Sequence, residues 1–214
     1  GNIKVFLRIR PTTRAFLGFT VKGDEDEIVD IDLGGAGSGA GQGGGHLLAG
    51  DAGADQQAQI ANNSKHHHRF KFDRIFNMDA TQEEVFKEVA VPVITDALNG
   101  VNGTIFAYGQ TGSGKTFTIT GGSEKYVDRG LIPRTISEIF ERIRKDGSSQ
   151  HQVFVSYLEI YNNSGYDLLS RDEQATKLEA LPKVTLREDE EGNTHLRSLS
   201  VNVAATEEDA LNLL

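Results

Sequence analysis

Cysteine and tryptophan are absent from this sequence of 214 residues, and proline and methionine are rare, with 4 and 1 residues. Without cysteine, neither a disulfide framework nor a thiolate metal site can form, which fits a reducing compartment. No apolar run approaches the length of a membrane-spanning helix and we expect no signal peptide, so we predict no membrane partner. A basic excess is also lacking, because the net charge is −9, and this argues against nucleic acid as a partner.

Glycine is the residue in excess, with 24 copies, and residues 34–53 hold ten glycines in twenty positions. Such a composition buries too little apolar surface to offset the entropy of ordering the chain. We therefore predict a Gly-rich disordered insertion over residues 34–68. Its end carries the run His66-His67-His68, which could bind a metal weakly, although a solvated loop end or an engineering remnant is the favoured interpretation.

Strands are predicted where apolar residues alternate with polar ones or form a continuous run. Alternation predicts strands at residues 3–9 and 69–76, and a run that is apolar on both faces predicts one central strand at 153–161. Two further apolar segments, 184–187 and 196–203, flank an acidic turn. This arrangement is typical of a β-hairpin.

Helices are predicted from capping signals and apolar spacing. A capping box at residues 81–84 begins an amphipathic helix that should end near Gly100 and kink at Pro92. Pro133 opens a second helix, and a third begins at residues 206–209. The last helical pattern is still running at residue 214, so we expect a truncated domain.

The most informative segment is Gly109-Gln110-Thr111-Gly112-Ser113-Gly114-Lys115-Thr116, which matches the phosphate-loop pattern G-x-x-x-x-G-K-T. Glycines allow backbone N–H groups to converge on phosphate oxygens, and a following helix would add its N-terminal dipole. Lys115 should reach the outer phosphates and Thr116 should ligate magnesium. The alternative is a flexible glycine turn, but a predicted strand at 104–108, after the turn Asn102-Gly103, supplies the context of a nucleotide site.

Hydrolysis needs a second acid, and each candidate has a competing structural interpretation. Asp189-Glu190-Glu191-Gly192 matches the D-x-x-G pattern, but a polar turn among four acids favours a solvated hairpin loop. Residues 28–32 are apolar with two acids, which favours a solvated edge strand. Glu159 is expected to be a buried, satisfied carboxylate or one that points to a layer boundary, with catalysis as the minority interpretation. The guanine-reading pattern N-K-x-D is absent. The residues thus predict nucleotide binding without a recognisable hydrolytic half.

The segment 102–116 closely resembles the phosphate-loop strand of kinesin motor domains, and further matches follow in kinesin order. They are Arg8-Ile9-Arg10-Pro11, Phe70 to Phe76, Arg129-Gly130-Leu131-Ile132-Pro133-Arg134, Ser156 to Asn162 and Tyr166-Asp167-Leu168-Leu169. The resemblance covers nearly the whole chain except the 34–68 insertion. Within the family, Ile119-Thr120-Gly121-Gly122 and Leu181-Pro182-Lys183-Val184 most resemble the axonemal kinesin subfamily nine.

The resemblance implies the roles of particular residues. Arg8, Arg10 and Pro11 match the adenine-side motif, and Phe117 takes the place of a ring near the adenine, with packing behind the helix as the alternative. The implied ligands are ATP or ADP with Mg²⁺, held by residues 109–117, and Lys115 is the implied catalytic residue.

The same resemblance implies that the hairpin loop 188–197 contacts tubulin. Here the loop is acidic and offers only His195 and Arg197 as cations, so contact with acidic tubulin should be weak. Asn163 stands where many kinesins carry glutamate, which puts the role of that glutamate in doubt. The serine- and arginine-bearing first switch and the Asp-Leu-Ala-Gly second switch of kinesins do not occur in these 214 residues.

The resemblance predicts a three-layer α/β P-loop NTPase fold, with a mixed, largely parallel sheet between helices, of which residues 1–214 form the N-terminal part. The predicted function is an ATP-hydrolysing microtubule motor of the cytoplasm and cytoskeleton, in the axoneme of a cilium or flagellum, that could dimerise through regions outside this chain. The alternatives are a non-motile axonemal scaffold that binds nucleotide and microtubules, and another P-loop enzyme such as a small-molecule kinase. Without both switches, we expect this fragment to hydrolyse little ATP.

Overall fold

The computed structural model describes residues 3–13, 18–22, 27–32, 67–122, 125–170 and 177–214. The chain forms two compact units, one of residues 1–85 and 109–114 and the other of residues 86–108 and 115–214. Most of the predicted Gly-rich insertion 34–68 lies outside the described residues. Its last two residues, 67 and 68, begin a strand.

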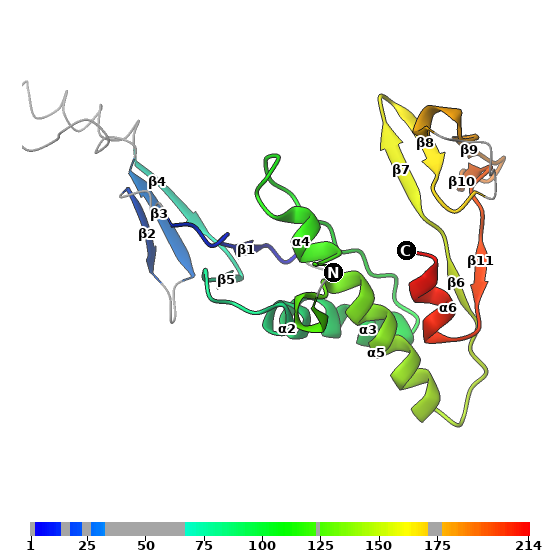
Figure 1. The fold of residues 1–214 in the computed structure, drawn as a ribbon, viewed down its shortest axis with the longest axis horizontal. Coiled ribbons are helices and arrows are strands. Elements are labelled where there is room, and N and C mark those ends of the chain that lie inside the picture. Colours follow the sequence, from blue (N-terminus) through cyan, green and yellow to red (C-terminus); the bar gives the residue numbers. More distant parts are fainter. Residues whose placement is uncertain (1–2, 14–17, 23–26, 33–66, 123–124, 171–176) are drawn as a thin grey trace, which may run out of the picture. The chain divides into compact units, whose positions relative to one another are not determined.

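The first unit contains a three-stranded antiparallel sheet of β2 (Phe19–Lys22), β3 (Ile28–Asp32) and β4 (His67–Lys71), with β3 in the middle (Figure 1). The expectation of a solvated edge strand at 28–32 is therefore wrong. Val29 is 2% exposed and Asp30 is buried, because neighbours on both sides cover the strand. Arg69 pairs with the Asp30 carboxylate through Nε at 2.7 Å and a second nitrogen at 3.1 Å, which offsets the cost of burying that charge.

The predicted strand at 69–76 is split between two sheets. β4 ends at Lys71, and β5 (Arg74–Phe76) pairs in parallel with β1 (Phe6–Arg8). Two adjacent amides make the change: Phe72 N donates to the Glu27 carbonyl at 3.0 Å, whereas Asp73 N donates to the Val5 carbonyl at 2.9 Å. Alternation of apolar and polar residues predicts an extended backbone, but it does not predict that the strand partner changes from β3 to β1.

The helix predicted after Thr81 begins as expected. Thr81 N donates to Glu84 Oε2 at 2.7 Å and Glu84 N donates to Thr81 Oγ1 at 3.2 Å, which completes the capping box. α2 (Gln82–Val85) leads into a π-helical segment, Phe86–Ala90, and then α3 (Val91–Leu98). The π segment ends just before Val91 and Pro92. Because proline has no N–H to donate within a regular helical turn, we attribute the π segment to Pro92, where the sequence predicted a kink.

In the second unit, α5 (Leu131–Lys145) packs against α3, α4 (Lys115–Ile119) and α6 (Glu207–Asn212) (Figure 1). Pro133 lies in its first turn, as the sequence predicts. Phe140, 7% exposed, forms a core cluster with Ala204 and Ala210, and Ile136 packs against it. Two side chains of this helix, Ile136 and Phe140, therefore contribute to the core of the unit.

The predicted central strand at 153–161 is also split. β6 (Val153–Val155) pairs with β11 (Asn202–Ala204), whereas β7 (Leu158–Tyr161) pairs with β8 (Ser164–Asp167). Residues 156 and 157 make the change, because Ser156 Oγ donates to the Ser200 carbonyl and Leu168 N donates to the Tyr157 carbonyl.

The turn between β7 and β8 explains the asparagine at 163. Asn162 and Asn163 have φ of 47° and 57°, and two consecutive left-handed residues form the tight turn that suits a two-residue hairpin. Asparagine tolerates this conformation better than most residues with a side chain. A local backbone requirement is thus sufficient to account for this residue.

The predicted hairpin is confirmed. β9 (Lys183–Glu188) and β10 (Thr194–Arg197) are antiparallel, with Leu186 opposite Leu196, and β9 also pairs with β8. The second arm is shorter than the expected 196–203, since its end belongs to β11 and pairs with β6. The third predicted helix is confirmed as α6, with a complete capping box between Thr206 and Asp209.

The strand predicted at 104–108 is not formed. Residues 101–109 form no regular secondary structure, and the side chains of Phe106 and Tyr108 are 78% and 95% exposed. A β-branched and aromatic run is compatible with a strand, but only a hydrogen-bonded neighbour makes one. The described strands form four separate small sheets with a single parallel pair, β1 and β5, so the broad α/β class is observed and the single central sheet remains a prediction.

Replacing Phe140 with alanine should destabilise the second unit by about 3 kcal/mol, because it empties the centre of the cluster. Phe154, 53% exposed on β6, is the matched control, and its alanine variant should cost less than about 1 kcal/mol. Denaturant unfolding of the complete protein measures both. Equal losses would show that the cluster around Phe140 is not the core.

Candidate functional site

The phosphate-loop segment 109–114 belongs to the first unit. Gly109, Gly112 and Gly114 have φ of 152°, 80° and 101°, which residues with a side chain rarely adopt. A Cβ at Gly109 would also lie 2.6 Å from Ser113 Oγ. The glycines are thus required by the backbone conformation of this turn.

A turn hydrogen bond and a side chain hold the middle of this segment. Ser113 N donates to the Gln110 carbonyl at 3.1 Å. The guanidinium of Arg10 donates to the Gly112 carbonyl. Two parts of the predicted site that are about a hundred residues apart in sequence are therefore brought together in the first unit.

Arg8 and Pro11 lie in the same N-terminal segment as Arg10. Arg8 ends β1, is half-buried and donates to Gln82 Oε1 at 2.6 Å, and this burial lowers the pKa of its guanidinium. Gln82 is itself 5% exposed, so the pair is anchored inside the unit. Pro11 is exposed. The sequence interpretation missed Gln82, because position 82 gave only a helix signal and nothing in it indicated a partner for Arg8.

Lys115, Thr116 and Phe117 follow the loop directly in the chain and form the start of α4 in the second unit. Lys115 is half-buried, Thr116 is exposed, and Phe117 is 43% exposed. The Phe117 ring lies 3.9 Å from the position of a Cβ on Gly122. Phe117 is therefore only partly covered by its own unit.

The end of α4 is bound to the start of α5. Gly130 N donates to the Thr120 carbonyl at 3.0 Å and Gly122 N donates to the Asp128 carbonyl at 3.0 Å. A Cβ at Gly130 would lie 2.5 Å from the Ile119 carbonyl oxygen, so the two backbones meet without room for a side chain. Gly121, with φ of 94°, follows the end of α4 in the left-handed conformation that is common after a helix.

The acids weighed as catalytic candidates have structural roles. Asp189 accepts from Asn193 N at 2.8 Å, Glu191 N at 3.0 Å and His195 Nε2 at 2.8 Å, which closes the hairpin tip. The hydrogen bond from His195, followed by that from the Asn193 amide, lowers the pKa of Asp189 to about 2. His195 is thus engaged with Asp189, and Glu159 is an exposed residue of β7 rather than a buried carboxylate.

Among the residues that the structure describes, no three His, Cys, Asp or Glu side chains gather as a metal-binding group. His67 Nε2 lies 3.7 Å from Asp30 Oδ1, and His68 stacks on Phe70 with ring centroids 6.3 Å apart. Both histidines are exposed in β4, and His66 lies outside the described residues. The histidine run therefore shows no metal-binding arrangement in its described part.

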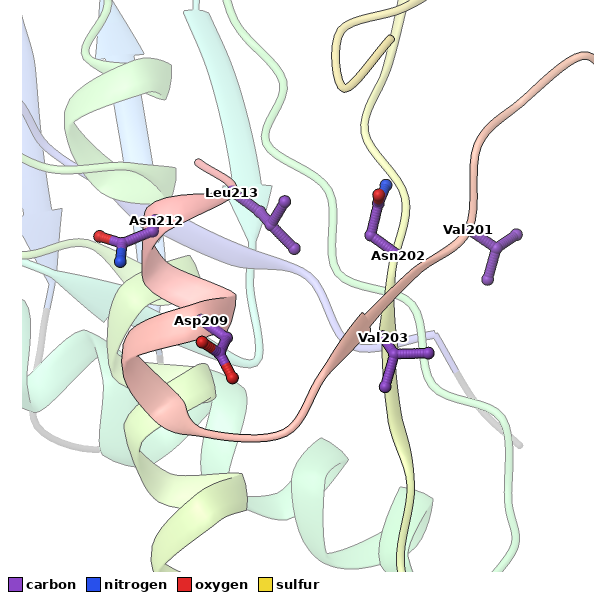
Figure 2. A pocket seen from close by; sticks show the side chains of 6 residues that line it. All are labelled: Val201, Asn202, Val203, Asp209, Asn212 and Leu213. Carbon is purple, nitrogen blue, oxygen red and sulfur yellow. The ribbon is translucent and has the colours of Figure 1, made fainter. Parts of the chain in front are cut away.

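A hollow in the second unit lies between β11 and the end of α6 (Figure 2). Its lining residues are Val201, Asn202, Val203, Asp209, Asn212 and Leu213. The Asp209 carboxylate already accepts from Thr206 N at 2.9 Å in the capping box. With two valines, a leucine and no cation, this lining does not suit a triphosphate.

Comparisons with known proteins show the family of this chain. The family model of the kinesin motor domain matches residues 40–214. The chain is 36% identical over 209 residues to Kinesin-like protein KLP1 of Chlamydomonas reinhardtii, which covers 98% of this chain and 24% of that protein. Over 213 residues it is 35% identical to Kinesin-like protein KIF9 of Homo sapiens, covering 100% of this chain and 24% of that protein. The chain belongs to the kinesin motor domain family.

A third relative, Centromere-associated protein E of Homo sapiens, is 43% identical over 142 residues, or 66% of this chain and 5% of that protein. The chain-long matches to KLP1 and KIF9 confirm the resemblance to kinesin subfamily nine. This chain spans about a quarter of the length of those two relatives. No helix within the described ranges combines the length and apolar character needed to cross a bilayer.

Asp189 should make the hairpin stability depend on pH. The pKa of Asp189 in the folded hairpin, about 2, lies below the ordinary aspartate pKa near 3.9. The ionised carboxylate therefore stabilises the hairpin fully above pH ~4, and this stabilisation is lost as the pH falls toward 2. Asp189→Asn should therefore increase amide exchange at Asn193 at pH 7, and the difference from the wild type should shrink between pH 4 and about 2. Glu190→Gln, on the same turn, is the control. A difference that does not change with pH would contradict this role of the carboxylate.

Proposed function

We propose that the complete protein is an ATP-driven microtubule motor, in which ATP binding and hydrolysis are coupled to movement along microtubules. The observation that carries the proposal is the segment 109–114, whose three left-handed glycines directly precede Lys115 and Thr116. Backbone of this kind allows several N–H groups to point at one anion, and this is how a phosphate loop binds a triphosphate. Membership of the kinesin motor domain family supports ATP as that triphosphate.

Each residue of the site takes a distinct task in this proposal. The amides of residues 109–114 bind the phosphates, Lys115 supplies charge to the outer phosphates as the catalytic residue, and the Thr116 hydroxyl ligates Mg²⁺. Bound Mg²⁺ supplies charge neutralisation on the phosphate oxygens. Gly109 suits this loop, since a Cβ there would lie 2.6 Å from Ser113 Oγ and would displace that side chain. Arg8, Arg10, Pro11 and Phe117 form the adenine side.

The partner and the location rest on the family. We place the protein on microtubules, in the cytoskeleton of a cilium or flagellum, because the two relatives aligned along the whole chain belong to the same subfamily. The hairpin of β9 and β10 is the described segment assigned to tubulin contact. Its acidic tip and the engagement of His195 by Asp189 support a weak contact there. A dimer would form through other regions of the protein.

Lys115→Ala should abolish ATP hydrolysis by the complete protein and weaken ATP binding at least tenfold, because the outer phosphates lose their cation. Steady-state ATPase assays with and without microtubules, together with nucleotide titration, measure this. Lys125→Ala, beyond the same helix, is the matched control and should leave both unchanged. If the wild type binds ATP and microtubules but does not hydrolyse ATP, the protein is a non-motile scaffold.

The 214 residues alone should hydrolyse ATP very slowly even with microtubules, because their sequence holds neither switch pattern of the family. A phosphate-release assay on this polypeptide, beside the complete protein, measures the difference. Comparable microtubule-stimulated rates would contradict the division of labour proposed between this segment and the rest of the motor domain.

A further inference from the structure

We propose that Arg10 is a positioning residue of the phosphate loop, which holds the Gly112–Ser113 peptide in its binding orientation whatever base the nucleotide carries. This inference rests on the proposed function, because it assumes that residues 109–116 bind a triphosphate. It assigns to Arg10 a task that the adenine-side resemblance does not include.

The first step is the anchoring of Arg10 itself. β1 is fixed in register against β5, with Leu7 opposite Ile75, and Ile9 N extends the pairing by donating to the Phe76 carbonyl at 2.9 Å. Arg8 is secured to buried Gln82. Arg10 therefore leaves the sheet at a defined place, between a paired residue and Pro11, whose ring fixes its own backbone φ.

The second step is the peptide that Arg10 reaches. A peptide unit is planar, so the Gly112 carbonyl and the Ser113 N–H rotate together. The carbonyl accepts from the Arg10 guanidinium and the N–H donates to the Gln110 carbonyl at 3.1 Å. One peptide plane is thus held at both ends, by the loop itself and by a side chain from the N-terminal segment.

The third step is why this peptide needs holding. Gly112 has φ of 80° and Gly114 has φ of 101°, and glycine can leave such conformations more easily than other residues can. Rotation of the Gly112–Ser113 peptide would break both of its hydrogen bonds and would allow its carbonyl oxygen to turn toward a bound phosphate. A carbonyl oxygen that faces a phosphate is repelled, so the loop would bind a triphosphate less tightly.

The geometry also separates this task from contact with the base. The nearest heavy atom to a Cβ placed on Gly112 is an Arg10 guanidinium nitrogen, at 3.9 Å. The guanidinium therefore lies against the backbone of the loop, where its described hydrogen bond is to the Gly112 carbonyl. Arg10 should thus affect every ligand that uses the loop, with or without a base.

The test uses the complete protein and three ligands that share phosphates: Mg·ATP, Mg·GTP and Mg·tripolyphosphate, the last by competition with a fluorescent nucleotide. Arg10→Ala should weaken all three by a similar factor, on the order of tenfold, as expected for a charged donor lost from a carbonyl. Arg10→Lys, which keeps one charged donor, should recover part of the loss for all three. Lys4→Ala, on the same segment, is the control and should bind like the wild type.

The outcomes separate this inference from the proposed function. A loss confined to ATP, with unchanged tripolyphosphate binding, makes Arg10 an adenine contact and overturns the inference alone. Unchanged binding of all three ligands also overturns it. If Lys115→Ala leaves tripolyphosphate binding intact, the loop is not the phosphate site and the proposed function fails. A thermal unfolding temperature of Arg10→Ala that equals the wild-type value without ligand shows that this variant is folded. If Arg10→Ala is not folded, Arg10→Lys is used instead, and its loss of affinity for the three ligands is compared.

Discussion

The constraint on which the candidate site depends is the absence of a Cβ atom at Gly109, Gly112 and Gly114 in the segment 109–114. Three of its residues adopt conformations that favour glycine, and one of them faces the Ser113 hydroxyl too closely for any side chain. A backbone with such conformations can present several amides to one anion. The surrounding contacts, the Ser113 turn and the Arg10 guanidinium, then select one conformation from those that glycine permits.

Local features of the fold were predictable from the sequence. The capping boxes at Thr81 and Thr206, the glycine that ends α4 and the hairpin of β9 and β10 all depend on residues a few positions apart. Their physical causes are complete within a short segment, so a pattern in the sequence is sufficient.

Strand partners were not predictable, because they depend on residues far away in the chain. The runs 69–76 and 153–161 are each one stretch of favourable residues, yet each changes sheet at two residues in its middle. Residues 104–108 have the composition of a strand without a pairing neighbour in the described chain. In the site, the glycine pattern was predictable from the sequence, whereas the hydrogen-bond partners of Arg8 and Arg10 were not. Outside the site, the burial of Asp30 in β3 was likewise not predictable.

The junction between α4 and α5 has a mechanical consequence. Gly121 and Gly130 bring two backbones into direct contact, and hydrogen bonds from both sides close the junction. Such a contact has no flexible side chain to absorb displacement. A shift of α4, which begins with Lys115, must therefore move the start of α5 as well. α5 in turn contributes Phe140 to the core cluster. Within the second unit, a displacement of Lys115 at the start of α4 would therefore be transmitted to α5.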